Sequence, residues 1–251
     1  MRINRVALSR YVFLLGLSYV AFLGATAPAI LLRRILPAKS GVTLEHLTGT
    51  VWHGTVQKIT FPSTWGLIQV RDLTWDWQWL YLFHGEFAFK LELANAAGNV
   101  IVARNVGGVR LAQADITLPA AELAQIVPSL TMWQPDGEVQ FQTQGFALTA
   151  NATSEARLIW RHAALNLSPL QPLGDYRLHL RNTHGEMNFQ LETEQGKLKL
   201  DGTGTYSRQD GLQFKGMAQT DAAYAADLKT LLDIMGSDRG DGVHIINLAL
   251  H

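Results

Sequence analysis

Cysteine is absent from the 251-residue chain, which excludes disulfides, thiolate zinc sites and a cysteine nucleophile. An excess of either charge is also absent, because 21 basic residues balance 21 acidic ones. A nucleic-acid partner is therefore not expected, since binding to phosphates needs a cationic face. The lack of cysteine leaves the compartment open, because it suits the periplasm and a reducing cytoplasm equally.

Signatures of catalysis are missing as well. The sequence contains no G-x-S-x-G elbow, no P-loop and no H-E-x-x-H motif. The stretch GTGTYS, residues 202–207, departs from the dinucleotide fingerprint, and His179 and His184 have no third ligand at metal-site spacing. We therefore predict that the protein is not an enzyme and that it needs no cofactor or metal.

A long uncharged run lies near the N-terminus. Residues 11–32, YVFLLGLSYVAFLGATAPAILL, would span roughly 33 Å as a helix, which is about the hydrocarbon thickness of a bilayer. The alternative is a cleaved signal peptide, since ATA at 25–27 has the small-residue pattern, but signal cores are shorter, about 7–15 residues. The length favours an uncleaved transmembrane helix between a tail, 1–10, and a linker, 33–42. The flanking arginines and lysine are nearly balanced, so they leave the orientation open.

The rest of the chain, 43–251, alternates apolar and polar residues over many short segments. Each segment begins at a glycine, the residue that tight turns with positive φ require. A period of two puts one side of a strand in the core and the other in water, as in antiparallel sheets. We predict a mainly β domain with a curved antiparallel sheet, and strands at 85–94, 107–118, 137–150, 174–182, 185–194, 196–206 and 211–220.

The stretch LTGTVWHGTV, residues 47–56, follows the same alternation. Gly49 and Gly54 punctuate it, so we predict a strand with a bulge or bend. His53 has no nearby acid in the sequence to orient it as a base, and no second histidine at ligand spacing. A reactive role for His53 is therefore not expected.

Two segments interrupt the β pattern and predict short helices. In 118–127, Pro119 fits a first helical position and Pro128 ends the helix. In 220–236, Asp221 fits an N-cap. The apolar stripe of this second helix, which we expect to pack on the sheet, consists of Tyr224, Leu228, Leu231, Leu232 and Met235.

The two predicted helices each end a similar series of strands. Both halves begin with an X-Leu-X-Trp-like strand, continue with glycine-led alternating strands, and stop at a helix. We therefore predict a weak internal duplication with sub-repeats at 43–130 and 135–236, stacked into one longer curved sheet.

An aromatic residue occupies every second position of WDWQWLYLF, residues 75–83. The members of this row are Trp75, Trp77, Trp79, Tyr81 and Phe83. If the segment is a strand, all of them share one face. They either fill the inside of a curved sheet as core or form an open apolar strip that binds a lipid chain or a protein partner. Trp160, in the corresponding strand of the second half, is expected on the same side of the sheet.

The motif SPLQPLGDYRLHL, residues 168–180, combines a proline-bracketed bend with the start of a strand. Gly174 allows an unusual backbone angle there, and Asp175 and Tyr176 begin the strand. This motif follows LTGTVWHGT and LTWDW, and it precedes LETEQGKLKLDGTGTY and FKGMAQ. In this order and spacing the chain resembles the type II secretion system protein N family over nearly its whole length.

The resemblance implies an uncleaved, single-pass inner-membrane helix with the β-rich domain in the periplasm, which would decide the orientation. It implies a non-enzymatic accessory role in the machine that exports folded proteins across the outer membrane, through contacts with other inner-membrane components. That family is also similar in fold to large membrane-anchored β proteins that handle lipids, although fold alone says little about activity. The alternative function is therefore a membrane-anchored β-groove protein that contacts or moves lipid.

Overall fold

The computed structural model describes residues 5–35, 40–63, 66–126, 130–147, 153–207, 209–240 and 242–250. Several parts of the expected elements lie outside these residues. They are 1–4 of the tail, 36–39 of the linker, Pro128, and the end of the predicted strand 137–150 at 148–150.

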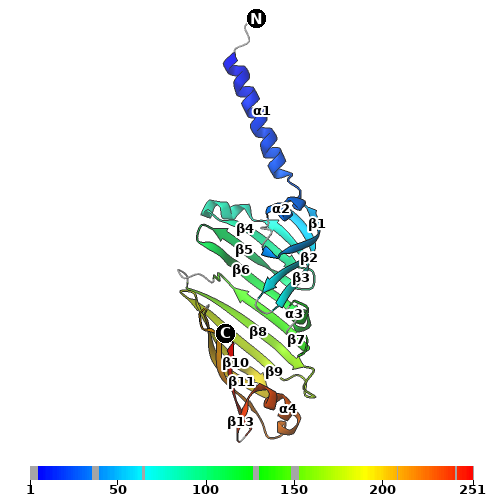
Figure 1. Ribbon diagram of the computed structural model, residues 1–251, viewed down its shortest axis with the longest axis vertical. Coiled ribbons are helices and arrows are strands. Elements are labelled where there is room, and N and C mark those ends of the chain that lie inside the picture. Colours follow the sequence, from blue (N-terminus) through cyan, green and yellow to red (C-terminus); the bar gives the residue numbers. More distant parts are fainter. Residues whose placement is uncertain are drawn as a thin grey trace.

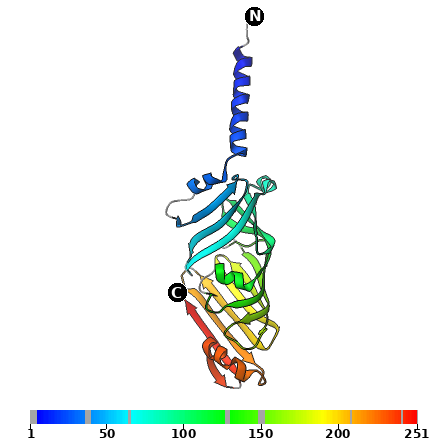
Figure 2. The same cartoon turned by 90° about the vertical axis from the view of Figure 1, so that its right-hand side faces the viewer.

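One antiparallel sheet of 14 strands runs through the described part of the chain, which confirms the mainly β prediction. Each strand pairs with the next in sequence, except that β14 lies between β12 and β13. The sheet twists and curls along its length (Figures 1 and 2). The strands are β1 (Thr43–Gly49), β2 (His53–Ser63), β3 (Gly66–Trp77), β4 (Phe87–Leu93), β5 (Ala97–Asn105), β6 (Gly108–Pro119), β7 (Pro135–Thr143), β8 (Thr153–Leu165), β9 (Gly174–Thr183), β10 (Glu186–Gly196), β11 (Leu198–Ser207), β12 (Gly211–Thr220), β13 (Ser237–Gly240) and β14 (Val243–Leu250).

The structure differs from the predicted strands at two places, where threonine hydroxyls bond to backbone groups in place of the hydrogen bonds between strands. β7 ends at Thr143, where the side chain donates to the Glu155 carbonyl at 2.7 Å and accepts the Gly145 N–H at 3.1 Å. The bulge or bend expected within a strand at 49–54 is a hairpin turn between β1 and β2, in which the Thr50 hydroxyl accepts the backbone N–H of His53 at 3.1 Å. Such side-chain bonds to the backbone favour turns over strands.

The strand register gathers the apolar positions on one face of the sheet. Trp75 lies opposite Leu91, Val139 opposite Trp160, and Leu178 opposite Leu191. The intervening polar residues therefore lie on the other face. Two helices, α3 (Ala120–Ile126) and α4 (Ala225–Met235), pack against the apolar face. The apolar residues of the alternating pattern therefore form the face that packs against the helices. The two predicted sub-repeats stay a prediction.

Helix α4 confirms the expected leucine stripe but begins later than predicted. Residues 222–224 form a turn, so the helix starts at Ala225 rather than next to Asp221. Leu228, Leu231 and Leu232 are buried in a cluster with residues of β11 and β12. These leucines close the apolar face at the C-terminal end of the sheet.

The expected helix over 11–32 does not continue to its predicted end. Helix α1 (Arg5–Ala25) stops before Pro28, because proline has no N–H for the ladder and disfavours helical geometry in the residue before it. The chain then forms η1 (Ala29–Leu31) and α2 (Leu32–Ile35), and Ala29 is buried against the sheet. Among the residues that the structure describes, no helix combines the length and apolar character needed to cross a membrane.

Candidate functional site

The aromatic segment 75–83 does not form the single row that its alternation predicted. β3 ends at Trp77, and Trp79–His84 forms the short 3-10 helix η3. The neighbouring strand begins at Phe87, so the chain has to reverse direction within this segment, which a straight strand through Phe83 cannot do. The five aromatic side chains therefore do not share one strand face.

Trp75 and Trp77 lie at the junction between α1 and the sheet. Trp75 is 7% exposed and donates its indole N–H to the Val51 carbonyl at 3.1 Å. The Trp77 ring lies 4.6 Å from the ring of Trp52, centroid to centroid. Trp52 in turn donates its indole N–H to the Gly24 carbonyl, in the last turn of α1, at 2.7 Å. This tryptophan cluster fastens the end of α1 to the ends of β2 and β3.

Helix η3 exposes most of its apolar side chains. Trp79 is 55% exposed and Phe83 is 79% exposed, and their rings meet edge to face with centroids 6.0 Å apart. Single exposed hydrophobic residues are ordinary, whereas a contiguous exposed group indicates a contact surface. We call Trp79, Leu80, Leu82 and Phe83 the η3 patch.

The η3 patch is held in place from its inner side. Tyr81 packs on the alanine cluster formed by β4, β5 and β6. Glu86, immediately before β4, is buried and accepts two hydrogen bonds from Arg110, at 3.0 and 2.7 Å, and one from Asn105 at 3.1 Å. A bidentate pair of this kind fixes geometry as well as adding energy. These contacts hold η3 against the end of the sheet.

The Glu86–Arg110 pair predicts a pH-dependent stability. The hydrogen bonds from Arg110 hold the pKa of Glu86 below its usual value, although burial opposes them. Because the folded pKa is depressed, the stabilisation is present above the unfolded pKa, about 4.3, and is lost as pH falls through the folded pKa. We expect Glu86→Gln to lower the melting temperature at about pH 7, and the difference from the parent to shrink towards about pH 3.

Thermal unfolding across this pH range, followed by circular dichroism, measures the effect. Glu138→Gln, at an exposed glutamate of β7, is the matched control for removing a carboxylate. A melting-temperature difference for Glu86→Gln that is independent of pH would contradict the charge-based explanation.

An apolar cavity of about 330 Å³ lies on the helix-bearing face, between α3, β7, β8 and the end of α4. Trp160 lines it, and the register places Trp160 on the same face as Trp75, as predicted. Its indole N–H is satisfied by the Asp136 carbonyl at 2.9 Å. A volume of this size is at the lower end for small-molecule sites. Other lining residues are Leu123, Leu130, Trp133, Val139, Leu158 and Met235.

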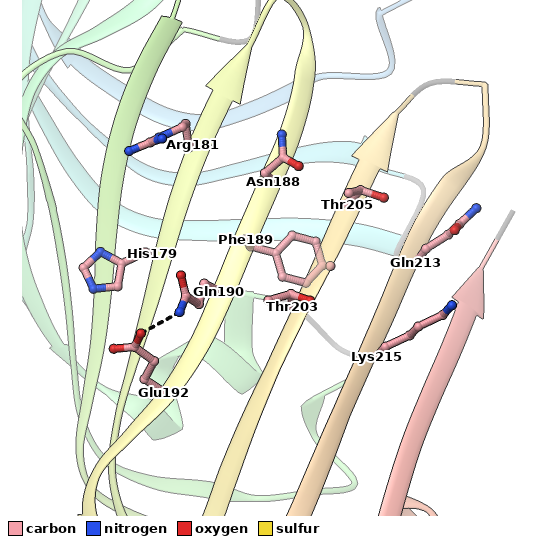
Figure 3. Close-up of a pocket in the computed structure, with 11 residues that line it drawn as sticks. His179, Arg181, Asn188, Phe189, Gln190, Glu192, Thr203, Thr205, Gln213 and Lys215 are labelled. Carbon is pink, nitrogen blue, oxygen red and sulfur yellow. Dashed lines mark hydrogen bonds between the residues drawn. The ribbon is translucent and has the colours of Figure 1, made fainter.

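The opposite face carries a hollow of about 620 Å³ across β9 to β12, and most of the residues that line it are polar (Figure 3). His179, Arg181, Glu192 and Lys215 line it, together with Gln190, whose amide donates to Glu192 at 2.7 Å. Figure 3 shows these side chains spread over separate strands. In the described ranges, no three His, Asp or Glu side chains come together to hold a metal ion.

The motif at Gly174 and Asp175 stabilises irregular points in two neighbouring strands. His162 has a positive φ of 51°, and its N–H donates to the Asp175 carboxylate at 2.6 Å. The other carboxylate oxygen of Asp175 accepts from the Gln195 amide at 2.7 Å, next to the irregularity in β10. Gly174 lies against Gly196, where a Cβ on either residue would collide with the other strand. The motif thus helps set the curvature of the sheet.

Tyr176, the third residue of the motif, is buried and contacts both Leu198 and Trp160. Its hydroxyl donates to the Leu198 carbonyl at 2.8 Å, and its ring lies 6.2 Å from the Trp160 ring. Burial raises the pKa of the Tyr176 hydroxyl. The contacts therefore connect this motif with the packing of the second half of the sheet.

His53 does have an acidic neighbour, which corrects the expectation from the sequence. The register of β2 and β3 places His53 opposite Asp76, and the Nδ1 atom of His53 contacts the Asp76 carboxylate. The two residues are far apart in sequence, so only the strand pairing could reveal this contact. The absence of a reactive role for His53 stays a prediction.

Comparison with known proteins adds evidence that covers the whole sheet region. A family model described as type II secretion system (T2SS), protein N, matches residues 40–247. The type II secretion system protein N of Pectobacterium carotovorum subsp. carotovorum is 24% identical over an alignment 245 residues long, and the alignment covers 93% of this chain and 93% of that protein. No solved structure matches the chain. Because the family match extends from just before β1 into β14, the chain belongs to the type II secretion system protein N family.

Proposed function

We propose that the protein is an accessory inner-membrane component of a type II secretion system. It supports export of folded proteins across the outer membrane through protein–protein contacts, and it is not an enzyme. The observation that carries this proposal is the family match over 40–247, supported by a relative of the same family aligned over 93% of both chains. Its proposed partners are other inner-membrane components of the secretion machine.

The proposed anchor is a single membrane pass formed by α1 and the adjoining uncharged residues, within 11–32. Its support is the absence of charge over that run and the outward position of apolar side chains such as Phe13 and Leu15, which are 69% and 70% exposed. The tail, 1–10, would be cytoplasmic and the sheet periplasmic. Large domains are translocated with little regard to flanking charge, so this orientation suits the chain.

Deletion of the gene and cross-linking of the full-length protein test the secretory role together. We expect deletion to reduce the amount of exported protein in the culture medium. We also expect cross-linking in cells that contain the machine to recover its other inner-membrane components. Normal export combined with no cross-link to any secretion component would contradict the proposal.

Cysteine labelling tests the proposed orientation, because the natural chain has no cysteine. Gln209→Cys places a thiol in the exposed turn before β12, and Ser9→Cys places one in the tail. We expect a maleimide that cannot cross the inner membrane to label Gln209→Cys in intact cells and Ser9→Cys only after lysis. No labelling of Gln209→Cys before lysis, or a mature chain that begins near Ala29, would contradict the anchor.

The second candidate function is a membrane-anchored β-groove protein that contacts or moves lipid. The apolar cavity beside Trp160, about 330 Å³ in volume, favours it because its lining is apolar. Mass spectrometry of the purified full-length protein distinguishes the candidates. Phospholipid that stays bound through purification would support the lipid function, and recovery of secretion components without lipid would support the secretory role.

A further inference from the structure

The η3 patch lies at the end of the sheet to which α1 is attached. Val51 donates its N–H to the Ala27 carbonyl at 2.9 Å, and Trp77 donates its N–H to the Trp52 carbonyl at 2.8 Å. Trp77 is the last residue of β3 and is separated from η3 by Gln78 alone. In Figure 1 the turquoise η3 and the lower end of α1 lie at the same end of the sheet, while α4 lies at the opposite end.

The composition of this end suits the boundary between lipid and water. Tryptophan and other aromatic side chains favour the headgroup level of a bilayer, where an apolar ring meets a polar layer. Phe87, at the start of β4, is also 56% exposed and adds apolar surface at this end of the sheet. Glu86 is turned inward and paired with Arg110, so its carboxylate does not oppose contact with anionic lipid. Arg34, which follows α1, is exposed and cationic.

The firm attachment of η3 also fits a surface contact. Tyr81 and the Glu86–Arg110 pair fix the helix before any contact is made. A preorganised element loses less conformational freedom on binding than a loose loop does. Trp79 and Phe83 therefore face outward from a fixed base.

We infer that the η3 patch inserts into the interfacial layer of the same bilayer that α1 enters. This inference rests on the proposed function, because it takes α1 as the membrane anchor. A single helix can tilt and rotate in the bilayer, whereas a second contact between the protein and the lipid fixes the tilt of the sheet. The phospholipid surface is the occupant, since the patch is joined through Trp77, Trp52 and Gly24 to the point where α1 ends.

Spin labelling of the full-length chain tests the inference in liposomes of phosphatidylethanolamine and phosphatidylglycerol. Leu80→Cys carries the nitroxide and leaves Trp79 and Phe83 in place. Ile234→Cys, on an exposed apolar residue of α4 at the far end, is the matched control, and Leu15→Cys reports on α1. We expect collisions with oxygen, relative to a water-soluble nickel chelate, to be several-fold higher at Leu80→Cys and Leu15→Cys than at Ile234→Cys.

A second variant tests whether the aromatic pair causes the insertion. In a Trp79→Gln and Phe83→Gln background, we expect the label at Leu80→Cys to return to the aqueous accessibility of Ile234→Cys, while Leu15→Cys stays in lipid. A label at Leu80→Cys that remains in lipid in this background would overturn the assignment to the pair.

The remaining outcomes separate this inference from the proposed anchor. A label in water at Leu80→Cys with Leu15→Cys in lipid would overturn the η3 contact and leave the anchor intact. A label in water at Leu15→Cys would overturn the anchor, and the η3 inference with it. A label at Leu80→Cys shielded from both reagents would indicate a protein contact, such as a second copy, and would also overturn the inference.

Discussion

Replacing Leu231 with alanine should lower the free energy of unfolding by about 2–5 kcal/mol, which is the usual loss for a buried leucine once the cavity is counted. Leu231 is 1% exposed and belongs to a buried cluster with Leu173, Leu198, Leu228 and Leu232. The dense packing of such a cluster prevents it from collapsing around the missing atoms. Denaturant unfolding of the full-length chain in detergent, followed by circular dichroism, measures the loss.

Ile234→Ala provides the control on the same helix. Ile234 is 56% exposed, so its truncation should change the free energy of unfolding by no more than about 0.5 kcal/mol. Equal losses for Leu231→Ala and Ile234→Ala would contradict the view that α4 closes the sheet through one buried stripe.

Replacing Trp75 with alanine should cost about 3–5 kcal/mol, as expected for a large aromatic side chain removed from a core. Trp75 packs with Ala29 and Val56, and its indole satisfies the Val51 carbonyl. The substitution therefore removes packing from the cluster that fastens the chain after α1 to the sheet. Unfolding monitored by circular dichroism again measures the effect on the full-length chain.

Trp79→Ala is the matched control, because it removes the same side chain from an exposed position in η3, four residues further along the chain. With Trp79 55% exposed, we expect a change within about 0.5 kcal/mol. A large loss for Trp79→Ala together with a small loss for Trp75→Ala would reverse the assignment of these two tryptophans to surface and core.

Much of the β architecture could be predicted because its signals are local. Strands β9, β11 and β12 follow the predicted segments within a few residues, since glycines stand at or next to their turns and their side chains alternate between core and water. The stripe of α4 was predictable for the same reason, because a period near 3.6 places Leu228, Leu231 and Leu232 together. The start of α4 differs from the N-cap predicted at Asp221, because residues 222–224 form a turn in place of the first turn of the helix.

The candidate site was less predictable, because its contacts join residues far apart in the chain. The contact of His53 with Asp76 depends on the pairing of β2 with β3. The buried carboxylate of Glu86 is paired with Arg110, a residue of β6 that is 24 positions further along the chain. A regular pattern such as alternating aromatics cannot indicate where the chain must reverse, so the sequence predicts that the row at 75–83 continues as a strand, which the structure does not show.

By itself, the amino-acid sequence determined that this protein is a mostly antiparallel β structure with an apolar N-terminal segment, because side-chain period and run length are properties of neighbouring residues. Only the tertiary structure decided that α1 ends at Ala25, that Trp75 is buried and that Trp79 is exposed. The physical reason is that burial depends on which strands pair and where the chain turns. In this protein the chain leaves β3 near the point where α1 contacts the sheet, and it continues as the exposed helix η3. Trp75 and Trp79 therefore lie in opposite environments, one buried and one exposed, although they belong to the same alternating pattern.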